Sequence, residues 1–466
     1  MTFGLLSRGN DDHPIEPGVY GIVPLRTVML GGVVVADDLT GACDTGHGFA
    51  ARGHRTKVLL DPQADVSAVD VLVVDTDSRY VTPQESIDRV RGAIDAHPAS
   101  VVFKKIDSTL RGNVSVEVDA ALTATIERST GDSHDDRGAT GVAVAAPASP
   151  AIDRTTACGY HLVDGALVTD TEPGRDVENG PSSAHLPTLF AETERSIEHL
   201  HIRTVANGAS AITKQLRDRE GRGRILTADA THDEHLANIA EAVRRLDVPT
   251  VYVGSSGLAN HVEVPSTGTD ADTAGDVSRP SPPEDSVGVL GVVGSVAPST
   301  LAALQAVPES TLIDLDPVAI VEDPDTTADL AVDRTREVLS REGCAVVTAA
   351  TDSEADDRAF AAGSEIGVSR HETRDRIAET LAEIAAVVVD IQQPSGVLLT
   401  GGDTAGNVLD ALNASAIALS GDAVEAGIPL GVIEGGTSEG SVLITKAGAF
   451  GDHKTVVNCL DRLQEL

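Results

Sequence analysis

The chain alternates short, valine-rich apolar runs with longer amphipathic segments rich in alanine, arginine and glutamate. The apolar runs lack internal polar positions and end in Gly, Asp, Ser or Thr, which indicates strands buried on both faces of a parallel sheet. The strands predicted in this way span residues 28–35, 71–75, 100–104, 141–145, 224–228, 250–253, 287–293, 311–315, 345–348, 396–399, 430–432 and 441–445. Strands that alternate with helical segments are typical of α/β proteins.

Three segments interrupt this alternation. Residues 263–285 are rich in Pro, Ser, Thr, Gly and Asp, which predicts an acidic linker between two domains, 27–262 and 286–466. Residues 127–138 predict an acidic surface loop, and residues 1–26 predict an N-terminal extension or a start assigned too early. The expected fold is α/β with two domains, each with a mainly parallel sheet flanked by helices, and with the functional site in the cleft between them.

Composition narrows the class of partner. The 466 residues include no Trp, four Tyr and six Phe, so the cores should be aliphatic. The formal net charge is −37, from 72 acidic and 35 basic residues. This charge argues against binding to a nucleic-acid backbone and disfavours docking on anionic lipid. Because molar salt shortens the Debye length to about 3 Å and screens self-repulsion, we expect a salt-loving source, a halophilic archaeon.

Cysteine usage and hydropathy bear on location. The four cysteines stand far apart and form no Cys-x-x-Cys pair, which fits a reducing cytosol better than a disulfide framework. The longest apolar runs are far shorter than the roughly 20 residues that span a bilayer. Near the start, Asp11, Asp12 and Glu16 stand where a signal peptide would be apolar. We therefore expect a cytoplasmic protein without membrane or nucleic-acid partners, and assembly into a homo-oligomer stays open.

Lysine is scarce, and its positions are informative. Of six lysines, Lys104 and Lys105 lie in Phe-Lys-Lys-Ile-Asp-Ser-Thr-Leu-Arg-Gly, and Lys446 lies in Thr-Lys-Ala-Gly-Ala-Phe-Gly-Asp. Lysine binds phosphate or carboxylate as a point charge, and Arg111 can grip such a group with two parallel hydrogen bonds. Both segments therefore predict anion sites. The alternative is that these cations pair with the abundant carboxylates.

The first predicted strand ends in Val-Ala-Asp-Asp-Leu-Thr-Gly-Ala. Ligands of parallel sheets bind at the carboxyl ends of strands, so Asp37, Asp38 and Thr40 are well placed to meet one. Carboxylates there can accept hydrogen bonds from sugar hydroxyls, hold a metal or take a proton. The alternative is that Asp38 or Thr40 only caps the following helix. Two adjacent aspartates favour a site.

Further charged residues follow the second and third predicted strands. They are Asp77, Arg79, Lys105, Asp107, Ser108 and Arg111. Together they predict a site for a small, hydroxylated, negatively charged molecule, because cations bind the acid group while carboxylates and hydroxyls bind the polyol. A fourth strand end adds Asp153 and Arg154, which can equally form a structural ion pair.

Two glycine turns stand out in the second domain, Val-Gly-Ser-Val-Ala-Pro-Ser-Thr and Leu-Thr-Gly-Gly-Asp-Thr-Ala-Gly. Backbone N–H groups at strand-to-helix turns cradle phosphates, although neither turn is a Walker A loop or a dinucleotide fingerprint. With the terminal Lys-Ala-Gly segment, they predict a nucleoside triphosphate site built from Ser295, Gly401, Gly402, Asp403, Thr404, Lys446 and Gly448. Asp403 would serve as a Mg²⁺ partner or proton acceptor, with a helix cap as the alternative.

Seven motifs occur in one order: Ala-Asp-Asp-Leu-Thr-Gly-Ala, Asp-Thr-Asp-Ser-Arg, Lys-Lys-Ile-Asp-Ser-Thr-Leu-Arg-Gly-Asn, Pro-Ala-x-Pro, Gly-Ser-x-x-x-x-Thr, Thr-Gly-Gly-Asp-Thr-Ala and Lys-x-Gly-x-Phe-Gly. Over residues 27–462 they resemble the four-carbon acid sugar kinases. The resemblance implies ATP-dependent phosphorylation of the terminal (4-) hydroxyl of a sugar acid such as erythronate, threonate or a 3-oxo-tetronate, with ATP and Mg²⁺ as cofactors. It also implies that the first domain binds the sugar acid and the second binds ATP.

The resemblance also assigns sides to individual residues. It places Asp37, Asp38, Arg79, Lys105, Asp107 and Arg111 on the substrate side, and Ser295, Gly401, Gly402, Asp403, Thr404, Gly436 and Gly448 on the nucleotide side. Ala297 departs from the family, which often has a hydroxyl residue there. Asp37, Asp38 and Asp403 all stay candidates for the general base, and no metal ligands are assigned.

Two other functions stay open. A nicotinamide-dependent oxidoreductase fits the alternation of strands and helices but lacks the dinucleotide fingerprint. A non-catalytic sensor of a sugar acid or nucleotide would need no proton acceptor, whereas the chain offers carboxylates on both sides. Stereoisomers of the acid differ too little for motifs to distinguish them.

Overall fold

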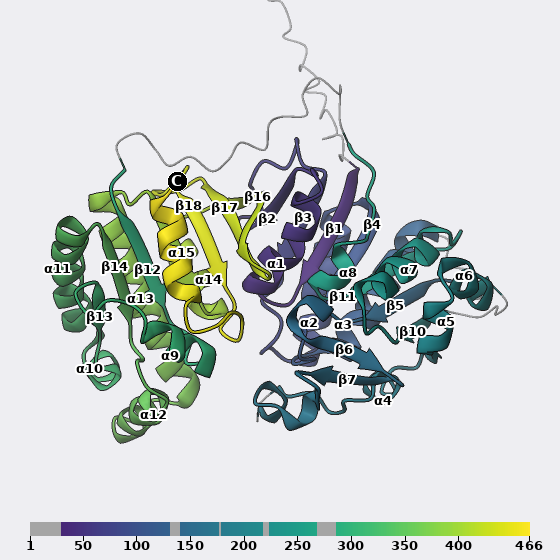
Figure 1. The fold of residues 1–466 in the computed structure, drawn as a ribbon, viewed down its shortest axis with the longest axis horizontal. Helices are drawn as coiled ribbons and strands as arrows, with labels where there is room; N and C mark the ends of the chain where they lie inside the picture. The colour runs from purple at the N-terminus through teal and green to yellow at the C-terminus, as the bar shows by residue number, and fades with distance from the viewer. Residues whose placement is uncertain (1–28, 131–139, 177–178, 218–222, 268–285) are drawn as a thin grey trace, which may run out of the picture.

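The structure is a computed structural model that describes residues 29–130, 140–176, 179–217, 223–267 and 286–466. The predicted N-terminal extension and most of the predicted linker and acidic loop lie outside these residues. The described chain forms two α/β halves that lie side by side along the longest axis (Figure 1). One sheet of 15 strands runs through both halves.

The first half contains a parallel sheet. Its strands in spatial order are β2 (Thr56–Leu59), β3 (Val71–Asp75), β1 (Leu30–Ala36), β4 (Ala99–Lys105), β11 (Thr250–Gly254), β5 (Val142–Ala146), β10 (Arg224–Ala228) and β9 (Ser196–Leu200). Each neighbouring pair among them is parallel. Strand β1 is apolar and buried at every position, as expected for a strand covered by helices on both faces.

Helices cover both faces of this sheet. One face packs against α1 (Leu39–Ala50), α5 (Ile202–Ala206), α6 (Ala209–Arg217), α7 (Asp233–Arg244) and α8 (Ser256–Ala259). The other face packs against α2 (Pro83–Ala96), α3 (Val114–Thr130) and α4 (Leu186–Leu189). A small antiparallel sheet of β6 (Arg154–Ala157), β7 (Tyr160–Val163) and β8 (Ala166–Leu167) lies beside this layer, with 3-10 helices at Pro150–Ile152, Val168–Asp170 and Pro173–Arg175.

The second half is parallel at one side and antiparallel at the other. Its strands in spatial order are β13 (Leu312–Asp314), β14 (Cys344–Thr348), β12 (Val289–Val293), β15 (Gly396–Thr400), β18 (Val442–Lys446), β17 (Ile428–Glu434) and β16 (Ala416–Glu425). Its helices are α9 (Pro298–Leu304), α10 (Pro317–Glu322), α11 (Pro324–Glu342), α12 (Ala355–Glu365), α13 (Arg370–Gln392), α14 (Gly402–Ala411) and α15 (Thr455–Gln464). Helices α11, α13 and α14 cover one face, and α9 and α15 cover the other.

Local sequence sets several helix ends. Thr82 caps α2 by accepting a hydrogen bond from Glu85 N, and Pro83 occupies the first helical position. Ser369 and Glu372 form a reciprocal capping box at the start of α13. Helix α11 ends at Gly343, whose φ of 71° lies in the left-handed region that favours glycine.

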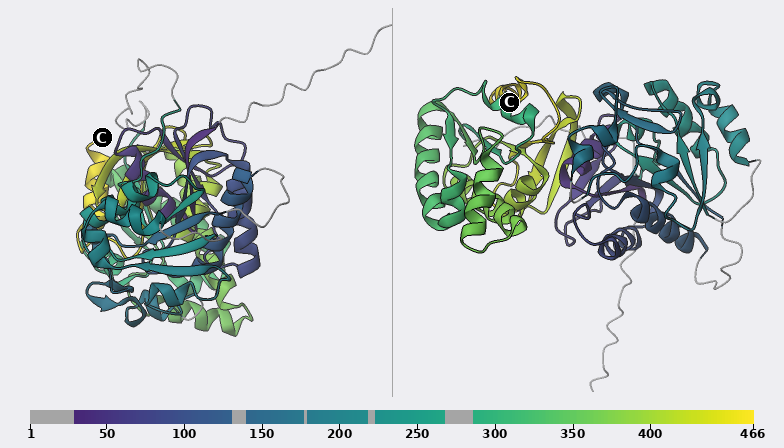
Figure 2. Two further views of the ribbon diagram at one scale, coloured as in Figure 1. Left: turned by 90° about the vertical axis from the view of Figure 1, so that its right-hand side faces the viewer. Right: turned by 90° about the horizontal axis from the view of Figure 1, so that it is seen from below.

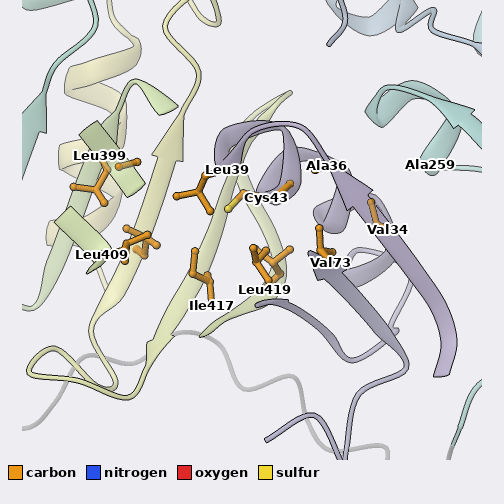
Figure 3. Close-up of a cluster of buried hydrophobic side chains, with 14 of the residues drawn as sticks. Val34, Ala36, Leu39, Cys43, Val73, Ala259, Leu399, Leu409, Ile417 and Leu419 are labelled. Atoms are coloured by element: carbon orange, nitrogen blue, oxygen red, sulfur yellow. The ribbon is translucent and has the colours of Figure 1, made fainter. Parts of the chain in front are cut away.

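The two halves are joined by strand pairing as well as by the linker. Strand β16 of the second half pairs antiparallel with β2 of the first, with Ile417 opposite Val58. Lys57 Nζ lies 2.7 Å from a carboxylate oxygen of Glu434 across this junction. In Figure 3, side chains from α1 and β3 lie beside Leu419 and others from the second half in one apolar cluster. The two expected sheets are therefore one continuous sheet with a shared core (Figure 2).

The α/β fold is confirmed, and the predicted strands agree with the observed ones to within a few residues. The sequence did not reveal β2, β9, β16 or the small sheet, because these strands are short or only partly buried. The sheet is mainly parallel, as expected, and β16 and β17 are its antiparallel strands in the second half. Residues 127–130, predicted as loop, form the last turn of α3. None of the described helices is long and apolar enough to cross a bilayer.

Candidate active site

Asp37 and Asp38 occupy the short connection between β1 and α1. Asp38 caps the helix, since its Oδ1 accepts a hydrogen bond from Gly41 N at 3.1 Å. Thr40 donates its hydroxyl to Asp38 Oδ2 at 2.8 Å. Asp38 therefore caps α1, as one interpretation of the sequence predicted. The same carboxylate also contacts Arg79, in the loop after β3.

Arg79, in the loop after β3, joins three carboxylates. Its Nε donates to Asp37 Oδ2 at 2.8 Å, and its Nη2 lies 2.8 Å from Asp38 Oδ1. The same Nη2 lies 3.7 Å from Asp107 Oδ1, beyond β4. The guanidinium therefore connects the carboxyl ends of β1, β3 and β4, which are neighbours in the sheet.

The adjacent lysines of β4 point to different environments, because successive strand residues face opposite sides of a sheet. Lys105 Nζ lies 3.7 Å from Asp37 Oδ1 and faces the aspartates. Lys104 Nζ is fully buried and pairs with Glu117 Oε2 at 2.9 Å. Ser78 completes this pair by donating its hydroxyl to Glu117 at 2.5 Å. Lys104 thus forms a structural ion pair, whereas Lys105 belongs to the site.

Gly41 makes room for Lys105. A Cβ built on Gly41 would collide with both Lys105 Nζ and Asp38 Oδ1. The glycine of the Ala-Asp-Asp-Leu-Thr-Gly motif therefore allows the lysine to lie against the first turn of α1.

The loop after β4 holds the second arginine. Arg111 Nε donates to Asp107 Oδ2 at 2.7 Å, and Thr109 donates its hydroxyl to the same oxygen. His161 of β7, in the small sheet, contacts this loop, because its Nε2 lies 2.9 Å from Ser108 O. Its Nδ1 lies 3.0 Å from a threonine hydroxyl on β6. No motif indicated His161, which stands in a segment not predicted as a strand.

Three turns of the second half form the opposite side. Gly401 has a φ of 92°, and its N–H donates to the carbonyl at the end of β18. A Cβ on Gly294 would collide with Thr404, and a Cβ on Gly448 would collide with Ser295 Oγ. The turns after β12, β15 and β18 therefore pack directly against one another, as only glycines allow.

The two sides meet at the start of α14. A Cβ built on Gly402 would lie 3.6 Å from Asp38 Oδ2 of the first half. Asp403, at the second position of α14, interacts electrostatically with Arg79 and Asp38. Asp38 and Arg79 of the first half thus meet Gly402 and Asp403 of the second half at their junction.

Comparison with known proteins agrees with this division. Residues 32–262 match the family described as sugar-binding N-terminal domain, and residues 290–456 match the nucleotide-binding C-terminal domain. The D-threonate kinase of Bordetella bronchiseptica is 31% identical over 93% of this chain and 97% of its own. The D-erythronate kinase of Heliobacterium modesticaldum is 31% identical over 92% of this chain and 96% of its own. This chain belongs to the four-carbon acid sugar kinase family.

Solved structures share the fold of this acid sugar kinase family member. A protein of Salmonella typhimurium superposes with a TM-score of 0.72 at 23% identity, over 92% of this chain and 99% of its own. A Haemophilus influenzae protein superposes with a TM-score of 0.65 at 21% identity, over 93% of this chain and 99% of its own.

Two predicted residues of this acid sugar kinase lie apart from the meeting point. Lys446 is fully buried, and its Nζ donates to Thr300 Oγ1 at 2.8 Å and to the carbonyls of Ala447 and Gly448 at 3.2 and 3.1 Å. Burial lowers its pKa to about 8. With three acceptors for its three protons, Lys446 holds the Gly448 turn and the start of α9 in place. Gly436 follows the antiparallel strand β17 and packs against the carbonyl end of α14, at the opposite edge of the sheet.

Asp77 and Asp75 lie at or just after the end of β3 but differ in exposure to solvent. Asp77 has a side chain that is 85% exposed and lies 3.7 Å from Arg89. Asp75, at the end of β3, accepts a hydrogen bond from Asp77 N at 2.9 Å. Burial, together with the neighbouring carboxylates of Asp38, Asp77 and Asp37, raises the pKa of Asp75 to about 8. Asp75 was expected only as the last residue of a strand, yet it places a carboxyl with a raised pKa beside the site.

The carboxylates of the site differ in basicity. Burial raises the pKa of Asp37, but Arg79, Lys105 and Lys104 outweigh it and lower the pKa to about 2. The pKa of Asp107 is held well below its usual range in the same way, by Arg111 and Arg79 against burial. The pKa of Asp403 is raised, mainly by burial and also by Asp38, although Arg79 opposes it. The pKa of Asp403 is therefore shifted in the opposite direction to those of Asp37 and Asp107.

Proposed function

We propose that this acid sugar kinase transfers the terminal phosphoryl group of ATP to the terminal hydroxyl of threonate or erythronate. One observation carries the proposal: the cluster of Asp38 and Arg79 in the first half lies against the glycine turn that begins α14 in the second. An anionic, hydroxylated acceptor and a triphosphate bound on the two sides would meet there. Positioning of this kind is the main demand of phosphoryl transfer.

The sugar acid fits the first half. Arg111 has the most accessible cationic group of the cluster, with a side chain 25% exposed against 8% for Arg79 and 4% for Lys105. We therefore assign the carboxylate of the sugar acid to Arg111, supported by Lys105. Asp37 Oδ1 is buried and accepts no hydrogen bond within the described part of the chain, so a sugar hydroxyl can donate to it.

ATP fits the second half. The turns at residues 294, 401 and 448 carry no side chain, so phosphate oxygens can approach their backbone N–H groups closely. The N-terminus of α14 adds unpaired N–H groups and the positive end of a helix dipole. Ser295 and Thr404 line the same turns and can donate hydroxyl hydrogen bonds.

Asp403 and Asp38 fit a Mg²⁺ ion that binds together with the triphosphate. Both carboxylates approach the junction from opposite halves, and Asp38 raises the pKa of Asp403 through repulsion that a cation would relieve. When bound, Mg²⁺ neutralises phosphate charge. One carboxylate oxygen of Asp403 would hold the ion, and the other would accept the proton of the sugar hydroxyl.

The relatives guide the choice of acceptor. Proteins named D-threonate kinase and D-erythronate kinase match this chain over more than nine tenths of its length, whereas a 3-oxo-tetronate kinase of Brucella melitensis matches 49% of it. We therefore place threonate and erythronate ahead of 3-oxo-tetronates.

The test is ADP release from Mg-ATP with D- and L-threonate, D- and L-erythronate and 3-oxo-tetronates, at several salt concentrations. We expect turnover of a threonate or erythronate, and at least about a hundredfold less in the Asp403→Asn variant, which excludes a contaminating kinase. If ATP binds but no acid of the panel is phosphorylated, the proposed acceptor is wrong. If ATP does not bind, the proposed nucleotide side is wrong.

We also infer a reducing, salt-rich cytosol as the working environment. A net charge of −37 suits high ionic strength, and the four cysteines are free in the structure. Thermal unfolding at increasing KCl checks this, because screening should raise the midpoint. A midpoint that falls or stays level would contradict it.

A further inference from the structure

Two histidines and a buried aspartate meet outside the kinase site, at the carboxyl ends of β9 and β10. His199 lies in β9, His201 precedes α5 and Asp229 follows β10. One ligand atom of each residue lies within 4.8 Å of the others. Among the residues that the structure describes, these three form the group of His, Cys, Asp or Glu side chains whose spacing suits a metal ion.

Asp229 is held rigidly. Its Oδ1 accepts a hydrogen bond from Gly159 N at 2.8 Å, and its Oδ2 accepts one from Ile202 N at 2.9 Å. The side chain is 1% exposed. Each oxygen has a further lone pair, and Oδ1 lies 3.2 Å from His199 Nε2.

The contacts of His199 allow the tautomer that a metal ligand needs. Its Nδ1 lies 2.9 Å from Thr227 Oγ1, and that hydroxyl donates its single proton to Glu198 O at 3.2 Å. In this arrangement the hydroxyl accepts from Nδ1–H. In neutral imidazole the other nitrogen, Nε2, then carries a lone pair and no proton.

The lone pair of His199 Nε2 faces a carboxylate oxygen. Nε2 is buried and has no hydrogen-bond partner within the described residues, although Asp229 Oδ1 is 3.2 Å away. A lone pair opposite a carboxylate repels it unless a cation or a second proton lies between them. The ring of His201 stands edge to face with that of His199, with centroids 4.8 Å apart, and is exposed, so it can turn towards the same point.

We propose that His199 Nε2, His201 and Asp229 bind a divalent transition-metal ion, with Zn²⁺ as the preferred occupant. Two imidazoles and one carboxylate are a ligand set for Zn²⁺, and the exposure of His201 leaves a fourth position for water. Thr227 acts as the outer partner that fixes the ring of His199, as expected around a metal-bound histidine.

The ion would stabilise the part of the first half that supports the sugar-acid loop. Asp229 binds the N–H of Gly159 in the turn between β6 and β7, and Ala230 exchanges backbone hydrogen bonds with Thr156 of β6. Strand β7 of the same hairpin supplies His161, which holds Ser108 O. The site lies away from the phosphoryl-transfer residues, so its role is structural.

Zn²⁺ binding to the full chain tests the proposal. The protein is treated with EDTA, exchanged into metal-free buffer at high salt and titrated with Zn²⁺ by calorimetry. We expect one tight equivalent for the wild type and at least about tenfold weaker binding for His201→Ala, whose exposed side chain can be removed without unfolding the protein. Co²⁺ should give a visible ligand-field band in the wild type that His201→Ala reduces.

The matched control is His232→Ala, because His232 and His235 form another edge-to-face pair, 5.3 Å between centroids. That variant should bind Zn²⁺ as the wild type does. Zn²⁺ should also raise the unfolding temperature of the wild type and of His232→Ala but not of His201→Ala. Equal Zn²⁺ affinity in all three proteins would mean binding at surface carboxylates and would overturn the proposal. An Nε2 proton on His199 in the NMR spectrum of Zn²⁺-treated protein would overturn it as well.

Discussion

The two halves of this kinase prepare their sides of the site with different chemistry. In the first half, Arg79 and Lys105 lie among carboxylates at distances of 2.8 to 3.9 Å, and most of these groups are buried. In the second half, the turns at Gly401 and Gly448 present backbone, and the nearby cation of Lys446 is turned inward to neutral oxygens. One side is built from charges and the other from glycines.

This difference follows from the two ligands. A sugar acid has hydroxyls and a carboxylate in fixed directions, and a network of paired charges holds side chains ready to match them. A triphosphate is recognised by N–H groups and helix dipoles, which need close approach of the backbone. We therefore expect substitutions in the first half to affect folding, and substitutions in the second half to affect nucleotide binding or the chemical step.

The largest effect should come from Asp403→Asn. The amide keeps the size of the side chain but cannot accept the proton, so we expect kcat to fall by about 10²–10⁴-fold. Steady-state kinetics with the best acid of the panel measures it, and calorimetry should show ATP binding within a few fold of wild type. Asp410→Asn, at the other end of α14, is the control and should leave kcat unchanged. Full activity of Asp403→Asn would remove Asp403 from the proton transfer.

Arg79→Gln should test the first-half side of the site, which is built from paired charges. It leaves Asp37, Asp38 and Asp107 without their shared cation, and unpairing buried charges costs about 3–5 kcal/mol. Urea unfolding at constant salt measures the loss. The control is Arg89→Gln, since Arg89 pairs with carboxylates at the surface and such pairs contribute about 0–1 kcal/mol. Equal, small losses in both variants would show that the buried network does not stabilise the first half.

Much of the site was predictable because its motifs are local. Asp37, Asp38, Lys105 and Asp107 stand at or just after the ends of strands of one parallel sheet, and that position alone brings them to one edge. The turn residue Gly401 was found in the same way. Valine-rich runs likewise gave the α/β fold, because buried parallel strands are continuous in sequence.

The remainder depends on contacts distant in sequence. Glu117 meets Ser78 across 39 residues, and His161 meets Ser108 across 53, so no local pattern indicates either pair. Gly436 was grouped with the nucleotide turns from its glycine-rich sequence, but the direction of β17 places it at the other edge. The pairing of β16 with β2, which unites the two halves, involves strands with too little apolar pattern to predict.

Gly448→Ala should test the glycine-built side. The new methyl group would collide with Ser295 and move the turn, so we expect the KM for ATP to rise about tenfold, or about 1.4 kcal/mol, with the KM for the sugar acid unchanged. Gly406→Ala is the matched control, because no atom lies within 4 Å of a Cβ at Gly406 in α14. That change should leave ATP binding intact and stabilise the helix slightly. A rise in the KM for the sugar acid alone would mean that Gly448 does not belong to the nucleotide side and would contradict this prediction.

Asp75→Asn should give the smallest effect. This effect on the free energy of unfolding should depend on pH. The pKa of Asp75 rises from 3.8 to about 8 on folding, so the folded chain keeps a proton that the unfolded chain releases. Wild-type stability from this group is therefore present below pH 4 and lost as pH rises towards 8, ideally by about 1.4 kcal/mol per unit. Because Asp75 is partly exposed, we expect Asp75→Asn to gain on the order of 1 kcal/mol over wild type between pH 5 and pH 7. Urea unfolding at each pH measures this, with the exposed Asp95→Asn as control. A stability difference that does not change with pH would mean that Asp75 is ionised in the folded protein, and that the first half tolerates one more buried negative charge beside Asp37.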